Sequence, residues 1–330
     1  MKYKDYVKIW CEYKKPLIKP STFTNWQNRL RIHLIPFFGE YELEELDSKL
    51  LQQFIFDKFN DNLRHKSVRD LDMIFRLTVS EAVELEYIKT ATKFIVKYPK
   101  NITQKKTITE VLNDSEYSKL FNYLMGSINY SDMGILISLC TGLRIGEVCA
   151  LQWKDIDFNN KMISVSKTAQ RIYIRDLDDS VGTTEHIVGA PKTASSYRTI
   201  PVMDALIDKL KTMRRDWPDE NCVIIDYLSG ANRQRKLRFG DPRTLRQRFE
   251  RVLKMLGINH HTFHALRHTF ASKLIEMGID PKTVSELLGH SDINTTLNLY
   301  VHPNEQQKRD AVNALLSKKG LKKKIKTVML

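Results

Sequence analysis

The stretch His264-Ala265-Leu266-Arg267-His268-Thr269-Phe270 decides how this chain is organised. Residues three apart are neighbours on a helix surface, so a helix here places His264 and Arg267 on one face. An imidazole and a guanidinium that face the same way are suited to hold a phosphate. His290, in Leu288-Gly289-His290, and then Tyr300 follow downstream. The sequence therefore predicts a basic, phosphate-holding cluster that ends at a tyrosine.

The composition indicates a polyanionic partner. The chain has 330 residues and a formal net charge of +14, and its isoelectric point is near 9.4. Lysines and arginines release counterions from phosphates, so nucleic acid is the commonest partner of such a chain. The hydrophobic fraction of 42% is enough for packed cores, and the length predicts two domains.

The sequence also predicts a cytoplasmic location. No apolar run approaches membrane-spanning length, and the N-terminus lacks the apolar core of a signal peptide. The cysteines show neither metal-ligand nor redox spacing, and three of them lie in apolar surroundings. We therefore expect buried free thiols in a reducing compartment. The cysteines are Cys11, Cys140, Cys149 and Cys222.

Residues 1–98 have the apolar periodicity of a helical domain. We expect one helix to start near Ser21-Thr22 and to end at Pro36, and another to start near Asp47. The clearest helix starts near Lys66. Its apolar face consists of Leu71, Ile74, Phe75, Thr78 and Ala82.

A linker is predicted at residues 99–110, where breaker residues and lysines replace the periodicity. The second domain, residues 111–316, is predicted to combine helices with one small antiparallel sheet. Residues 155–158 and 162–165 flank Asn159-Asn160 and predict a hairpin. Residues 171–174 are expected to pair with residues 198–201, and the polar segment 176–189 between them is interpreted as an insertion. A basic tail, residues 317–330, follows.

Together, the motifs resemble the signature of the tyrosine recombinase, or phage integrase, family. They are Arg144-x-x-Glu147, Lys192 on a hairpin, His264-x-x-Arg267, Leu288-Gly289-His290 and Tyr300, in this order. The resemblance covers essentially the whole chain. It implies a mostly α fold, with an N-terminal helical, SAM-like core-binding domain and a mixed α/β catalytic domain that form a C-shaped clamp on DNA.

The resemblance implies a role for each position. Arg144 and Arg267 are expected to grip the scissile phosphate, because the guanidinium fork suits phosphate oxygens. His264 and His290 are expected to hydrogen-bond the same phosphate, and His264 is the expected partner of Tyr300. Tyr300 is then the nucleophile, which forms a 3′-phosphotyrosyl link.

Lys192 resembles the hairpin lysine that protonates the departing 5′ hydroxyl, and Lys167 is a nearby alternative. Glu147 resembles the acidic residue that supports the site, by orienting Arg144 or His264. A phosphotyrosyl bond conserves the energy of the cleaved diester, so no ATP is expected. We also expect no metal or other cofactor, because the carboxylates do not cluster as metal ligands.

The implied partner is double-stranded DNA that carries attachment or core sites. The resemblance further implies a homotetramer on DNA, a C-terminal tail exchanged between subunits, accessory DNA-bending or excision factors, and a nucleoid-associated enzyme encoded by a bacterium, phage or mobile element. Relatives often begin with a small arm-site-binding domain, whereas this sequence starts at the predicted core-binding domain. The basic residues that we expect to contact DNA are Lys19, Arg29, Arg64, Lys66, Arg69, Lys100 and Lys105.

The expected function is site-specific DNA recombination through a Holliday junction, as in integration or excision of a mobile element. An Xer-like resolvase of chromosome or plasmid dimers is an alternative within the same family. A type IB topoisomerase-like enzyme and a catalytically silent DNA-binding regulator are others, and the intact catalytic set argues against the regulator.

Overall fold

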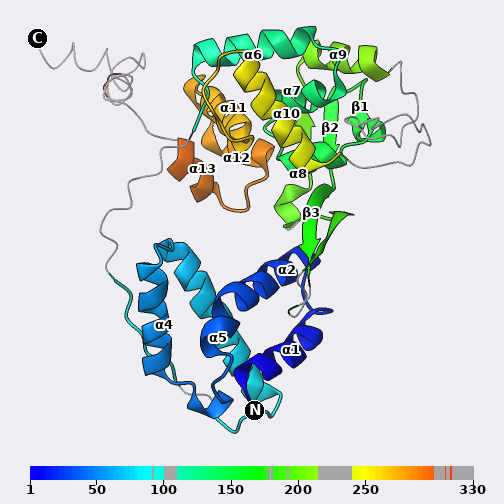
Figure 1. Ribbon diagram of the computed structural model, residues 1–330. Helices are drawn as coiled ribbons and strands as arrows, with labels where there is room; N and C mark the ends of the chain where they lie inside the picture. Colours follow the sequence, from blue (N-terminus) through cyan, green and yellow to red (C-terminus); the bar gives the residue numbers. More distant parts are fainter. Residues whose placement is uncertain are drawn as a thin grey trace, which may run out of the picture. The chain divides into compact units, whose positions relative to one another are not determined.

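The computed structural model describes residues 1–90, 93–99, 110–175, 177, 181–191, 193–214, 240–300, 309 and 313. The chain divides into two units, each with its own packing (Figure 1). Unit 1 comprises Met1–Thr107 and Gln170–Ile187, and unit 2 comprises Ile108–Ala169 and Val188–Leu330. Residues 170–187 thus group with unit 1, although they lie within the sequence of the predicted second domain.

Residues 1–90 of unit 1 are helical around an aromatic core. Tyr3, Phe38, Phe54 and Phe75 are fully buried there. The ring centroid of Phe38 lies 4.3 Å from that of Phe75 and 5.0 Å from that of Phe54. Each such pair adds about 0.5–1.5 kcal/mol beyond its burial. The helices are α1 (Tyr3–Lys14), α2 (Pro20–Arg29), α3 (Ile35–Phe38), α4 (Ser48–Asn60) and α5 (His65–Glu84), and the predicted apolar face of α5 is buried.

The prediction that Pro36 ends a helix is wrong. The chain runs from α2 through a π-helical turn, Leu30–Leu34, directly into α3, where Pro36 occupies the first turn. The Ile35 N–H donates to the Leu30 carbonyl across this wider turn. A proline is tolerated in a first helical turn because its missing N–H leaves no bond unmade there.

Residues 93–99, here called the docked segment, lie extended along α4 and α5. The Ile95 N–H donates to Ser48 Oγ at 2.9 Å. The Gln52 side chain binds both backbone groups of Lys97, accepting its N–H at 2.6 Å and donating to its carbonyl at 2.8 Å. Alternate side chains of the segment pack against the core of unit 1. The chain is therefore held to unit 1 as far as Pro99.

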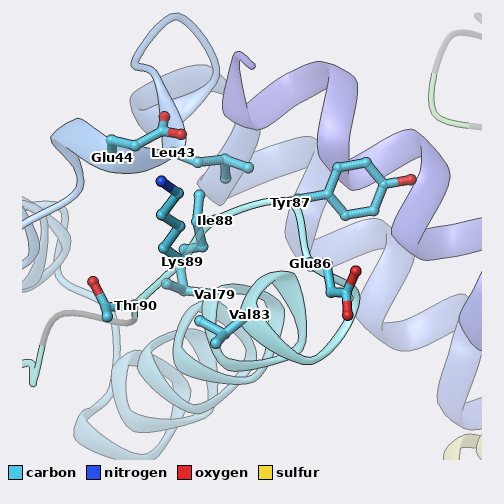
Figure 2. Close-up of a pocket in the computed structure, with 9 residues that line it drawn as sticks. All are labelled: Leu43, Glu44, Val79, Val83, Glu86, Tyr87, Ile88, Lys89 and Thr90. Carbon is cyan, nitrogen blue, oxygen red and sulfur yellow. The ribbon is translucent and has the colours of Figure 1, made fainter.

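Unit 1 also has a hollow of about 800 Å³ beside the C-terminal end of α5 (Figure 2). Apolar, polar and charged side chains line it, and none of them belongs to the predicted catalytic set. The lining residues are Leu43, Glu44, Val79, Val83, Glu86, Tyr87, Ile88, Lys89 and Thr90.

Unit 2 is built around α7 (Tyr130–Thr141), in which Ser131 to Thr141 are all buried. Local sequence sets many of the helix starts. Asn113 caps α6 by accepting from the Glu116 N–H at 2.9 Å, and Glu116 accepts in return from the Asn113 N–H. The other helices are α6 (Asp114–Gly126), α8 (Ile145–Ala150), α9 (Asp204–Arg214), α10 (Pro242–Met255), α11 (His264–Glu276), α12 (Pro281–Leu288) and α13 (Ile293–Tyr300).

The predicted hairpin is present, since β1 (Ile156–Asp157) pairs antiparallel with β2 (Met162–Val165). The predicted pairing of residues 171–174 with residues 198–201 is wrong. Instead β5 (Arg198–Pro201) pairs with β2, with Ile163 opposite Ile200, while β3 (Thr168–Ile174) pairs with β4 (Thr183–Gly189). Burial selects the pairing, because Ile163 and Ile200 are 0% and 1% exposed. The largely exposed β4 has no apolar alternation by which it can be recognised.

Two smaller predictions concern the thiols and the membrane. The three cysteines in the described part of the chain, Cys11, Cys140 and Cys149, are buried free thiols, as expected. Burial raises the pKa of the Cys11 and Cys140 thiols to about 12. Among the described helices, none has the length and apolar character needed to span a bilayer.

Candidate active site

The turn after α7 positions Arg144. Gly142 caps α7 in the left-handed region, at φ +66°, where glycine is favoured. A Cβ there would lie 2.7 Å from Phe270 Cδ1 and 2.8 Å from Leu288 Cδ2. Because α11 and α12 pack this closely on the turn, they hold Arg144 in place as the N-cap of α8.

Glu147 is a buried carboxylate that two arginines share. It accepts from the Arg144 backbone N–H at 3.0 Å and from Arg144 Nη1 at 2.9 Å. Arg198 donates to both of its oxygens, at 3.2 and 2.9 Å. Burial alone would raise the pKa of Glu147, but its hydrogen bond to Arg198 and the charges of both arginines lower it instead. Glu147 is therefore ionised at neutral pH.

Arg267 is almost completely buried, with 1% of its surface exposed. Its Nη1 donates to the Gly142 carbonyl at 2.9 Å and its Nη2 to the Leu288 carbonyl at 2.7 Å. Both carbonyls stand at helix C-termini, which lack internal donors and carry partial negative charge. Arg267 thus links the C-terminal ends of α7 and α12 and places a buried positive charge next to the site.

His264 lies in the first turn of α11, with its ring against that of His268, 4.5 Å away between centroids. Loss of water around the ring, together with the charges of His268, Arg267 and Arg144, lowers the pKa of His264 to about 4. The imidazole is therefore neutral at pH 7 and is able to accept a proton.

His290 follows Gly289, which caps α12 in the left-handed region at φ +67°. Its Nδ1 is 2.8 Å from Thr296 Oγ1 of α13. Burial, together with the charges of Arg267 and Arg144, lowers the pKa of His290 to about 4. The structure thus brings together five of the predicted residues within unit 2, namely Arg144, Glu147, His264, Arg267 and His290.

Tyr300 is the last residue of α13, one helical turn beyond Thr296. The contact between Thr296 and His290 therefore ties the helix that carries Tyr300 to the cationic cluster. Lys192 lies outside the described residues. Its alternative, Lys167, donates from Nζ to Gln152 Oε1 at 3.0 Å.

The predicted DNA-contact residues of unit 1 fall into two groups. Arg29 and Arg69 are engaged within the unit: Arg29 Nη2 donates to Asp70 Oδ2 at 2.8 Å, and the Arg69 guanidinium lies 4.8 Å from the Tyr98 ring centroid. The others stand at helix starts or outside the described residues: Lys19 occupies the N-cap position of α2, Arg64 and Lys66 flank the first residue of α5, and Lys100 and Lys105 are not described.

Sequence reasoning missed Arg198, which binds Glu147 from β5. Its signal was a single charged residue that opens an otherwise uncharged strand, Arg198-Thr199-Ile200-Pro201, a few residues after Lys192. A charge at that place needs a partner if it is buried.

Residues 103–307, which contain all the predicted catalytic positions, match the Phage integrase family. This chain belongs to that family. Residues 2–59 also match the N-terminal SAM-like domain of phage integrases. The chain is therefore a tyrosine recombinase, an enzyme that cleaves and rejoins DNA.

Similar proteins support this assignment. A protein of Caldanaerobacter subterraneus subsp. tengcongensis named "Tyrosine recombinase XerC-like" is 30% identical over 90% of this recombinase and 78% of its own length. The ICEBs1 integrase of Bacillus subtilis is 24% identical over 88% of this chain and 76% of its own length.

The fold has solved counterparts. The Tn1549 transposon integrase, in complex with transposon right end DNA, superposes with a TM-score of 0.71 at 21% identity, over 96% of this recombinase and 100% of that chain. A lambda integrase tetramer bound to a Holliday junction superposes with a TM-score of 0.61 at 18% identity, over 92% and 80%. The mostly α fold with small antiparallel sheets is thus confirmed.

Proposed function

We propose that this recombinase integrates or excises a mobile element by cutting attachment-site DNA at Tyr300. The observation that carries the proposal is the convergence of two arginines and two neutral histidines on one place in unit 2, next to the start of the helix that ends in Tyr300. Such a group neutralises a phosphodiester as it becomes pentacovalent.

In the proposed step, the Tyr300 oxygen attacks the scissile phosphorus while the bond to the 5′ oxygen breaks. The products are a 3′-phosphotyrosyl link and a 5′ hydroxyl, which takes its proton from Lys192. The guanidinium of Arg144, whose side chain is 37% exposed, meets the phosphate at the surface. Arg267 stabilises the developing charge from below.

The histidines are proposed to hydrogen-bond the phosphate, and His264 is proposed to accept the proton of Tyr300. With pKa values of about 4, His264 and His290 are neutral before DNA binds. A phosphate anion beside them offsets the arginine charges and raises both pKa values. His264 is then a better acceptor for the tyrosine proton once the DNA is in place, so activation of Tyr300 is coupled to binding.

Unit 1 is proposed to hold the DNA backbone. Lys19 and Arg64 occupy the N-cap positions of α2 and α5, where the helix dipole already places partial positive charge. Cations at this end disfavour the isolated helix, whereas a bound phosphate is stabilised by both. Lys66, Lys100 and Lys105 are proposed to add phosphate contacts.

Strand exchange in this proposal takes place in a homotetramer on two DNA sites. The supporting observation is the fold that this chain shares with the lambda integrase tetramer bound to a Holliday junction. Residues 317–330 are proposed to pack on a neighbouring subunit, and accessory DNA-bending proteins to set the direction.

A covalent-trapping assay tests the proposal. The substrate is a nicked suicide duplex built from the DNA that flanks the gene, and the product is a protein–DNA adduct that survives denaturation. The wild-type chain should form it, Tyr300→Phe should not, and the matched control Tyr41→Phe, an exposed tyrosine of unit 1, should. Binding without an adduct would instead favour a silent regulator.

An Xer-like dimer resolvase is the second candidate, because of the similarity to the XerC-like protein of Caldanaerobacter. A resolvase should recombine two related core sites without flanking arm sites. Recombination of minimal core sites that is equally fast with and without flanking DNA would favour this candidate over the integrase.

A further inference from the structure

Arg198, at the start of β5, is a buried guanidinium with four acceptors. Its side chain is 6% exposed. Nε donates to the Leu287 carbonyl at 2.8 Å, and Nη1 donates to the Ser196 carbonyl at 3.1 Å and to Glu147 Oε1 at 3.2 Å. Nη2 donates to Glu147 Oε2 at 2.9 Å. This bidentate geometry fixes the carboxylate in position as well as in charge.

Arg198 and Arg144 both pair with the carboxylate of Glu147. Glu147 binds both guanidiniums, so one negative charge is shared between two positive charges. Without Arg198, Glu147 would have Arg144 as its remaining partner among these three residues. The low dielectric around the buried Glu147 carboxylate makes such an ion pair strong. Glu147 would then offset the positive charge of Arg144 and weaken its attraction for a phosphate.

Arg198 also holds the turn that leads to His290. Its bond to the Leu287 carbonyl and the bond of Arg267 to the Leu288 carbonyl cap successive carbonyls at the end of α12. A Cβ at Gly289 would lie 3.0 Å from Arg198 Cδ. The backbone immediately before His290 therefore packs directly against the Arg198 side chain.

We propose that Arg198 is a positioning residue of the recombinase, which pairs with Glu147 and so leaves the positive charge of Arg144 less compensated and available to the scissile phosphate. This proposal rests on the proposed function of Arg144. It differs from a purely structural ion pair because it predicts that removing Glu147 together with Arg198 restores activity.

Adduct formation is measured as a first-order rate at saturating enzyme, well below the melting midpoint of every variant. Arg198→Gln should slow cleavage by about 10- to 100-fold, since it weakens one of the groups that stabilise the transition state. Arg198→Lys should lie between that variant and the wild type, because it keeps the charge and loses the fork. The double variant Glu147→Gln/Arg198→Gln should recover about tenfold relative to Arg198→Gln.

Arg248 offers a matched control in the same unit. It makes a bidentate pair with Asp132, which is 0% exposed, at 2.7 Å for both bonds. Arg248→Gln should lower the melting midpoint and leave the cleavage rate unchanged. The proposal is overturned if folded Arg198→Gln cleaves at the wild-type rate, if the double variant is as slow as Arg198→Gln, or if Arg248→Gln is equally slow.

Binding of tungstate, a tetrahedral oxyanion, separates this proposal from the proposed function. Calorimetric titration of the full chain needs no cleavage. Tungstate should bind more weakly to Arg198→Gln and regain affinity in the double variant. This pattern in a chain that forms no adduct would refute the proposed cleavage and support the role of Arg198. Adduct formation with unchanged tungstate affinity and rate in Arg198→Gln would refute only the role of Arg198.

Discussion

The substitution Gly142→Ala tests whether the turn before Arg144 is set by its packing against α11 and α12. The new Cβ would lie 2.7 Å from Phe270 Cδ1 and 2.8 Å from Leu288 Cδ2, closer than side-chain atoms pack. Gly257→Ala is the matched control, because Gly257 has φ +64° against +66° at Gly142 and has no atom within 4 Å of the added Cβ.

The two variants share the backbone cost and differ in the steric one. An alanine in the left-handed region costs about 1 kcal/mol. Overpacking at Gly142 adds about 1–3 kcal/mol. We therefore expect Gly142→Ala to lower the free energy of unfolding by about 2–4 kcal/mol and Gly257→Ala by about 1 kcal/mol. Gly142→Ala should also slow cleavage, since the Gly142 carbonyl binds Arg267.

The measurement is hydrogen exchange by mass spectrometry across a urea series. Peptides from α7 and α11 report on unit 2, and peptides from α5 report on unit 1 as an internal reference. Protection in unit 2 should fall more in Gly142→Ala than in Gly257→Ala, and protection in unit 1 should not change. Equal losses in the two variants would show that the steric argument at Gly142 is incorrect.

Three further predictions concern protons and the docked segment. Lys192→Ala should cleave ordinary DNA slowly. It should recover on a substrate with sulfur in place of the bridging 5′ oxygen, because a thiolate leaves without a general acid. If Lys167→Ala recovers on this substrate and Lys192→Ala does not, Lys167 is the general acid. The pKa values of His264 and His290 lie near 4 in the folded chain against an ordinary 6.5, so the unfolded chain binds more protons in between. The free energy of unfolding should therefore rise from pH 4 to 6.5 and then level off, and an unaltered slope in His290→Gln would contradict this. Gln52→Ala removes both side-chain bonds to Lys97 and should speed proteolysis within the docked segment, with unchanged cleavage there as the opposing result.

Local interactions explain what was predictable. Contacts between residues three or four apart determine three features: the buried face of α5, the capping pair Asn113 and Glu116, and Arg144 at the start of α8. Such contacts can be predicted from short stretches of sequence. The motif residues were recognised because several short motifs follow one another in the order of the family, although each motif alone is a weak signal.

One error arose from local backbone geometry and the other from competition between distant residues. Pro36 does not end the helix as the local rule predicts, because a π-helical turn lies just before it and Pro36 then occupies the first turn of α3. In the sheet, β5 was predicted to pair with residues 171–174 of β3, but the buried pair of Ile163 and Ile200 places it beside β2. Strand pairing depends on which faces are buried in the folded chain, and a strand as exposed as β4 has no pattern that shows it.

The sequence by itself thus determined which chemical groups this recombinase has: two arginines, two histidines and a tyrosine in a recognisable order. Only the tertiary structure decided which partners surround them and that the two histidines are neutral at pH 7. Glu147 and Arg198 are 51 residues apart in the chain, and Arg267 and Gly142 are 125 apart. Burial makes such pairings strong and lowers the histidine pKa values, because a charge removed from water is stabilised only by the partners that folding places beside it.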